Sequence, residues 1–146
     1  MGNLDYRRIP VSEVCEIERA RAGRVYPSGA CYVALSATND TVNQLHEPSE
    51  IDGRYAVLVP NDEGDGEYLK VVLDRTFPRW LMAHRAGVNL QSEELATIDV
   101  EWHEDANARQ QVMAMSRKLN ALIDMEQKTI DGLKDSKQYF LIRMFV

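Results

Sequence analysis

The chain of 146 residues lacks the features of a secreted or membrane-bound protein. Its two cysteines, Cys15 and Cys31, lie far apart, among apolar neighbours and outside any C-x-x-C or Cys/His pattern. We interpret them as small buried residues of a reduced compartment. No apolar run reaches the length of a membrane helix, and no basic-plus-apolar signal peptide is present. We therefore expect a cytoplasmic protein with no membrane partner.

Positive charge is also scarce. The net charge is -6, and the excess of acids falls in residues 1–100, which hold ten Lys/Arg against sixteen Asp/Glu. Residues 101–146 hold seven of each. Tight non-specific binding of nucleic acid is driven by counterion release at basic faces. Any role on DNA must therefore be local, or shared with a more basic partner.

Sequence motifs for catalysis and for cofactor or metal binding are missing. There is no P-loop, dinucleotide fingerprint, nucleophile elbow or adenine-methyltransferase motif. The acidic loop 61–66 begins like an EF-hand, but Val72 stands where the bidentate glutamate is required. The three histidines have no ligand-like spacing with each other or with the cysteines. We expect no enzyme activity, no metal and no cofactor.

Hydrophobic patterning divides the chain into two parts, residues 1–101 and 102–146. With 45% hydrophobic residues the chain can bury a real core. Short strands and short helices alternate through the first part, and the second reads as one long helix. The predicted fold class is α+β: a small globular domain with a mixed sheet, followed by a long C-terminal helix that pairs as a coiled coil.

Three strands are predicted in the first part. Residues 31–35 alternate between two faces, and residues 55–59 form a compact apolar run bounded by a glycine and a proline. Residues 98–100 are expected to close the part as a third strand. The turn chemistry of residues 61–66 predicts a loop.

Helices are predicted between these strands. Apolar positions over about 67–83 follow helical spacing, with Pro78 as a break or kink. Ser12 is a plausible N-cap for a short helical turn through Ile17, and Ser92 opens another short helix.

The second part is expected to be helical over about 105–137, which contains no proline. A helix of this length reaches on the order of 50 Å, which outruns a small domain. Its apolar residues follow heptad spacing with a drift, as in a stutter or a 3.6-residue stripe. A helix folded back on its own core stays an alternative, but pairing with a partner is favoured. The residues assigned to dimerisation are Val112, Met115, Leu119, Leu122, Ile123, Ile130, Leu133 and Phe140.

Four segments share motifs, in order, with one known family. Residues 9–29 contain a Gly-Arg-Val-Tyr-Pro-Ser-Gly run, residues 33–38 end in Leu-Ser-Ala-Thr, and residues 87–95 read Gly-Val-Asn-Leu-Gln-Ser-Glu-Glu-Leu. The helix of the second part ends in a Lys-rich segment and Met-Phe. Together they resemble the target-recognition domain and the long conserved helix of specificity subunits in type I restriction–modification systems.

The resemblance implies a module that reads double-stranded DNA without catalysis. Its helices would pair antiparallel as a spacer, and methyltransferase subunits, which would hold the S-adenosylmethionine, would dock on it. Family members have two recognition domains and two such helices, whereas this chain has one of each. That departure implies a homodimer that reads an interrupted palindrome. The alternatives are an interaction protein that docks on the methyltransferase without reading sequence, and an unrelated α/β enzyme or ligand-binding domain.

Two basic clusters are the candidate DNA contacts that follow from this resemblance. Arginine can be bidentate to guanine, and both basic residue types hold phosphates. A solvated helix face is the alternative for each cluster, and residues 40–67, with eight acids and one arginine, would repel DNA if they flank the groove. The candidate residues are Arg19, Arg21, Arg24, Lys70, Arg75, Arg79 and Arg85.

Overall fold

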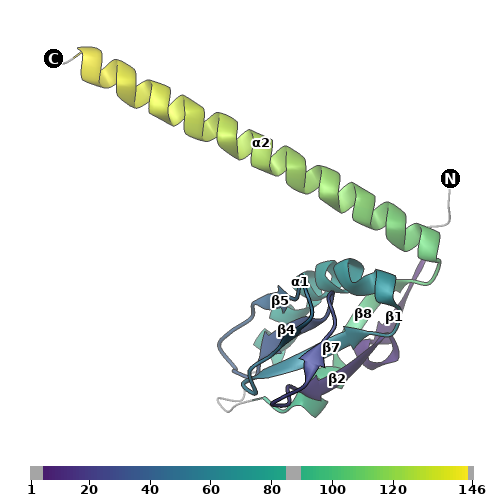
Figure 1. Ribbon diagram of the computed structural model, residues 1–146. Helices are drawn as coiled ribbons and strands as arrows, with labels where there is room; N and C mark the ends of the chain where they lie inside the picture. Colours follow the sequence, from purple (N-terminus) through teal and green to yellow (C-terminus); the bar gives the residue numbers. More distant parts are fainter. Residues whose placement is uncertain (1–4, 85–89, 145–146) are drawn as a thin grey trace. The chain divides into compact units, whose positions relative to one another are not determined.

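The computed structural model describes residues 5–84 and 90–144, with side chains to Tyr139. The chain divides into two compact units, Met1–Gln110 and Gln111–Val146. The first unit contains all the described strands, and the second continues helix α2 (Ala106–Met144) (Figure 1). Among the described residues, no helix has the length and apolar character to cross a membrane.

A four-stranded antiparallel sheet forms the centre of the first unit, in the order β2-β7-β4-β5 (Figure 1). In that order its strands are Cys15–Arg19, Tyr55–Pro60, Cys31–Ala34 and Val42–Gln44. Strand β7 lies inside the sheet because successive residues Ala56, Val57 and Leu58 are all buried, which requires cover on both faces. Strand β2 is at the edge, since among the described strands it pairs with β7 alone.

Each face of this sheet is covered by a different part of the first unit. Helix α1 (Gly66–Ala83) packs on one face through buried residues such as Leu69, Leu73 and Phe77. On the other face, Tyr26 and Val57 belong to a buried cluster beside the short pair β3 (Val25–Tyr26) and β6 (Ser49–Glu50).

The start of α1 requires glycine. A Cβ at Gly66 would stand 2.7 Å from the carbonyl oxygen of Gly29, closer than side-chain carbons approach. The side-chain amide of Gln44 donates to the carbonyl oxygens of both glycines, at 3.1 Å for Gly29 and 2.6 Å for Gly66. The helix therefore begins in direct contact with the edge of the central sheet.

A second antiparallel pair, β1 (Tyr6–Pro10) with β8 (Asp99–His103), completes the first unit together with two 3-10 turns. The turns are η1 (Val11–Glu13) and η3 (Ser92–Thr97). A capping box between Gln91 and Glu94 begins η3, which explains why helical structure starts at Ser92.

A buried ion pair joins the start of α1 to the first turn of α2. Arg109 Nε lies 3.0 Å from Asp65 Oδ1, and both residues are less than a tenth exposed. The guanidinium also donates to the carbonyl oxygens of His103 and Glu104, each at 2.9 Å, and covers the ring of Trp102. These hydrogen bonds offset the desolvation free energy that burying two charged groups costs.

Most of the predicted elements are confirmed. The structure confirms the predicted α+β class with a long C-terminal helix and the strands predicted at 31–35 and 55–59. The helix predicted over 67–83 is present and continues through Pro78, so of the predicted break or kink the break is absent. The strand predicted at 98–100 begins one residue later and extends to His103.

Two predictions are wrong. All described pairings are antiparallel, so the sheet is not mixed. The helical turn predicted through Ile17 ends at Glu13, and Cys15–Arg19 form a strand. Polar Glu16 and Glu18 alternate there with Cys15 and Ile17, which is the period of a strand, and pairing with β7 stabilises it.

The ion pair predicts a large loss of stability when its arginine is removed. In Arg109→Ala the Asp65 carboxylate stays buried without its charged partner, so the free energy of unfolding should fall by about 3–5 kcal/mol. Arg75→Ala is the matched control: it breaks the exposed pair with Glu101 and should cost at most about 1 kcal/mol. Urea unfolding followed by tryptophan fluorescence compares the two. Equal losses would contradict the structural role of the buried pair.

Candidate nucleic-acid interface

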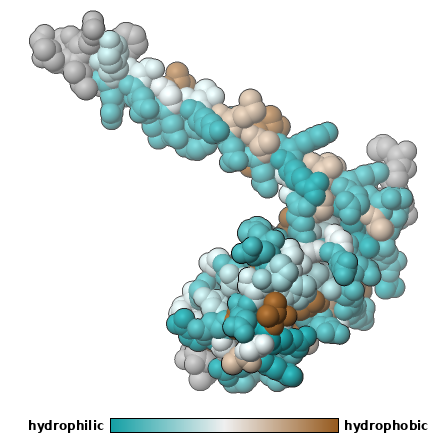
Figure 2. All heavy atoms as spheres, in the orientation of Figure 1, coloured by the Kyte–Doolittle hydropathy of each residue, from teal (hydrophilic) through white to brown (hydrophobic). Residues whose placement is uncertain are grey.

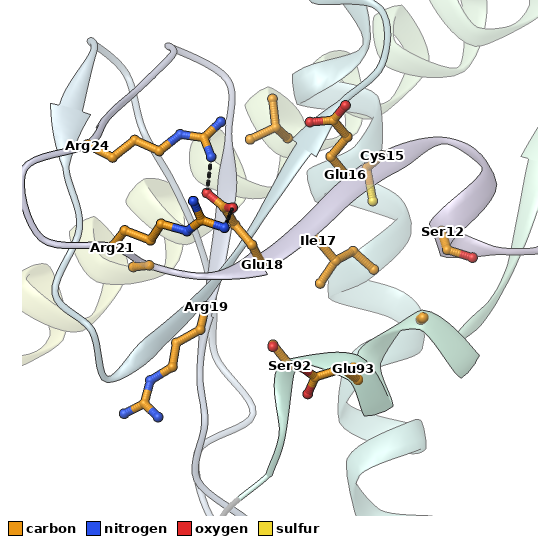
Figure 3. Close-up of a pocket in the computed structure, with 13 residues that line it drawn as sticks. Ser12, Cys15, Glu16, Ile17, Glu18, Arg19, Arg21, Arg24, Ser92 and Glu93 are labelled. Atoms are coloured by element: carbon orange, nitrogen blue, oxygen red, sulfur yellow. Dashed lines mark hydrogen bonds and ion pairs between the residues drawn. The ribbon is translucent and has the colours of Figure 1, made fainter.

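The first basic cluster lies at the end of the edge strand β2 and in the turn that follows it. Arg19, Arg21 and Arg24 line a hollow of about 880 Å³, together with residues of η3 such as Ser92 and Glu93 (Figure 3). Arg21 and Arg24 turn toward Glu18, whereas Arg19 points away from it (Figure 3). The three arginines therefore line one hollow, as their grouping in the sequence predicts, but their side chains point in different directions.

Glu18 holds two of the three arginines. Its carboxylate forms an ion pair with Arg24, lies 3.6 Å from a terminal nitrogen of Arg21, and accepts the Tyr26 hydroxyl at 2.8 Å. Arg24 also lies over the Tyr26 ring, 5.1 Å from its centre. Desolvation is the main cause of a raised Tyr26 pKa, so the hydroxyl stays protonated and donates to Glu18. The charges of Arg21 and Arg24 are thus partly balanced inside the cluster.

Arg19 is placed differently from its two neighbours. Its Nε donates to the carbonyl oxygen of Gly53 at 2.7 Å, and the side chain is exposed. Among the described residues, neither terminal guanidinium nitrogen has a hydrogen-bond or ion-pair partner. Arg19 therefore presents an orientated charge without a counter-charge beside it.

The second basic cluster lies on α1 and is mostly ion-paired. Lys70 Nζ lies 2.6 Å from Asp74, and Arg75 lies 3.3 Å from Glu101. Arg79 is exposed and has no ion-pair partner among the described residues. The seventh predicted contact, Arg85, lies outside the described residues.

Arg8 joins this second cluster and was missed by sequence reasoning. With Arg75 and Arg79 it lines a hollow of about 350 Å³. Arg8 lies on strand β1. The hydrophobic pattern does not predict this strand, because four of its five residues are exposed. Turn η3 contributes residues to both hollows, Ser92 to the first and Thr97 to the second. The structure thus places Arg19, Arg21 and Arg24 in one hollow and Arg8, Arg75 and Arg79 in another.

The acidic stretch 40–67 is less repulsive than its composition implies. Asp65 is buried against Arg109, and Glu67 has an interaction partner. Asp52 pairs with Arg54, whose backbone and side-chain hydrogen bonds lower the pKa of the Asp52 carboxyl and keep it charged. Three of its eight acids are therefore engaged within the first unit.

Helix α2 carries the residues assigned to dimerisation, and most are exposed. Figure 2 shows apolar side chains at several points along the helix among hydrophilic ones. Those 43–66% exposed are Met115, Leu119, Leu122, Ile123, Ile130 and Leu133. Val112 is half-buried, and the side chain of Phe140 lies outside the described residues. The helical unit by itself therefore leaves an apolar stripe uncovered.

Solved structures of two specificity subunits share this fold. The S subunit of a type I restriction–modification system from M. genitalium matches 88% of this chain with a TM-score of 0.63 at 11% identity. The HsdS subunit from Thermoanaerobacter tengcongensis matches 88% with a TM-score of 0.68 at 12% identity. No family model and no curated protein matches the chain.

The chain has the fold of a type I specificity subunit, over part of that subunit's length. It spans 44% of the M. genitalium chain and 40% of the other. The resemblance found in the sequence motifs is thereby confirmed at the level of fold.

Two cysteines provide a test of the packing beside the first hollow. Cys15, in its wall, is 2% exposed and Cys31 is fully buried, and burial raises the pKa of each thiol to about 12. Among the described residues no cluster of His, Cys, Asp or Glu could hold a metal ion. Both thiols therefore stay protonated in the folded chain.

We expect both thiols to resist iodoacetamide at pH 8.5 in the folded chain and to react in urea. Above the usual thiol pKa of 9.0, the unfolded chain releases protons that the folded chain keeps until about pH 12. The free energy of unfolding should therefore fall as pH rises through this window and show no such loss below it. Mass spectrometry of the labelled chain and urea unfolding at several pH values measure both effects. Rapid labelling of folded Cys15 would contradict the packing.

Proposed function

We propose that the chain is a DNA-specificity module of a type I restriction–modification complex. The observation that carries the proposal is the match over 88% of the chain to two type I specificity subunits, at less than half of their length. We infer that the matched part corresponds to one recognition unit and one spacer helix. The proposed division follows the sequence: a recognition domain over residues 1–101 and a spacer helix with its tail over 102–146.

The proposed role is non-catalytic and cytoplasmic. The module selects the DNA sequence, and methyl transfer from S-adenosylmethionine belongs to a partner methyltransferase subunit docked on it. The hollows of the first unit support a binding role, since arginine side chains line both of the hollows described above. Arg8, Arg19 and Arg79 are the best-placed phosphate or base contacts, because their side chains are exposed and hold no ion pair among the described residues.

The second part of the proposal is a homodimer joined through α2. Exposed apolar side chains lie at heptad-like spacing along the helix, and water is a poor environment for such a stripe. A second copy offers a matching stripe and would restore two recognition units about a two-fold axis. Such a dimer reads the same half-site twice, in opposite orientations.

Selection from random duplexes tests the DNA role. The chain is mixed with its methyltransferase subunit and a pool of random duplex DNA, and the DNA retained in the complex is sequenced. We expect enrichment of an interrupted palindrome, because symmetric protein faces symmetric half-sites. A complex that forms without enriching any sequence would contradict the specificity role and favour the interaction protein that only docks on the methyltransferase.

The helix pairing has a separate test. In Leu119→Asp with Leu122→Asp, two carboxylates replace apolar side chains of the stripe, so dimerisation should weaken by about 100-fold or more. The matched control is Ala114→Asp with Ala121→Asp, which adds the same charges on the opposite, exposed face and should stay dimeric. Light scattering after size exclusion gives the molar mass, and tryptophan fluorescence checks that the first unit stays folded. Loss of the dimer in both variants, or in neither, would contradict pairing through this stripe.

A further inference from the structure

A further hollow, which shares Arg19 with the first, lies where strands of the central sheet end. Strand β2 ends at Arg19, β4 ends at Ala34, and β7, which pairs with both, begins at Tyr55. The hollow has a volume of about 450 Å³, and we call it the strand-end hollow. Its polar lining residues are Arg19, Ser36, Asn39, Arg54 and Gln91. Loops held by a rigid scaffold are where proteins commonly place recognition side chains.

Arg19 is orientated for a bidentate contact. The bond from its Nε to the Gly53 carbonyl oxygen, at 2.7 Å, fixes the plane of the guanidinium. It leaves both terminal nitrogens without a partner among the described residues, and two guanidinium nitrogens are what bind O6 and N7 of guanine. Because the side chain is already ordered, less conformational entropy is lost on binding.

The loop that holds Arg19 is itself fixed. Arg54 binds Asp52 through its backbone N–H at 2.9 Å and through two side-chain nitrogens at 3.3 Å each. Its carbonyl oxygen accepts the backbone N–H of Leu35 at 3.0 Å. Gly53, between these two residues, is thus held in a turn with little freedom to move its carbonyl oxygen away from Arg19.

Two amide side chains in the same hollow keep donors available. Asn39 Oδ1 accepts the backbone N–H of Thr41 at 3.0 Å, and Gln91 accepts the backbone N–H of Glu94 at 3.1 Å through its main-chain carbonyl oxygen, not through its side chain. Each amide nitrogen is left without a partner among the described residues, and each side-chain oxygen has a lone pair available. Asn and Gln with both groups available can contact adenine in a bidentate manner.

We propose that the strand-end hollow is the base-reading site of the first unit, with Arg19 as the residue that specifies a guanine. Asn39 and Gln91 contact bases beside it. This inference rests on the proposed function, and it separates Arg19 from Arg21 and Arg24, whose guanidinium groups are engaged with Glu18. Those two residues hold the turn and add positive charge, and Arg19 supplies specificity.

The test uses the duplex that the wild-type chain selects together with its methyltransferase subunit. Affinity is measured for that duplex and for each duplex with one base pair replaced. For the wild-type complex, replacing the guanine read by Arg19 should weaken binding roughly 5- to 150-fold. In Arg19→Ala, replacing the same guanine should weaken binding by about threefold or less in each half-site. Replacements at the other positions should weaken binding as much as they do for the wild-type complex. Arg19→Lys should lose the same discrimination, because lysine keeps the charge but lacks the planar fork.

Arg7→Ala is the matched control. It also removes one exposed arginine of the first unit, which pairs with Glu104 and lines none of the three hollows described above. This variant should keep every base preference. Circular dichroism confirms that all variants are folded.

Three outcomes separate the two claims. Selective loss of one guanine preference in both Arg19 variants supports the inference. A wild-type chain that selects a sequence, with Arg19 variants that select the same one equally sharply, overturns the inference and leaves the proposed function intact. A wild-type chain that selects no sequence overturns both.

Discussion

The buried ion pair between Asp65 and Arg109 is the interaction on which the first unit most depends. It joins the start of α1, the end of β8 and the first turn of α2, with the guanidinium donating to a carboxylate and to two backbone carbonyls. A buried charge pair of this kind is costly to break from one side only. It holds α1 in the position where it covers the central sheet, and with it the cluster formed by Arg8, Arg75 and Arg79.

The helical unit is stabilised in a different way. Its 39-residue helix contains no proline and a single glycine, so local propensity supports it. Its apolar stripe, however, is exposed at Leu119, Leu122 and Ile123. The proposed pairing of two copies through α2 would cover this stripe.

The sequence predicted most of the architecture because long periodic segments dominate it. Helix α1, strand β7 and helix α2 each follow from hydrophobic spacing. The helical turn predicted through Ile17 was wrong because the N-cap signal at Ser12 is followed at once by residues with strand alternation, and pairing of Cys15–Arg19 with β7 decides in favour of the strand. The sheet's antiparallel order depends on contacts distant in sequence, which periodicity does not contain.

The sequence predicts which basic residues belong to the candidate site, but not which of them are ion-paired or how they are orientated. The sequence identified Arg19, Arg21 and Arg24 as a cluster, yet only the fold reveals that Glu18 engages two of them and that Gly53 orientates Arg19. Arg54 and Asn39 join Arg19 in one hollow through the sheet register, although up to 35 positions separate them in the chain. No spacing rule in the sequence connects them.

The molar mass of the wild-type chain in solution tests the central claim, which is that two copies join through α2 to form one recognition body. Sedimentation equilibrium over a range of concentrations measures it directly. We expect a species of twice the 16.6 kDa of one chain, with dissociation only on dilution. A mass of one chain at every concentration would contradict it.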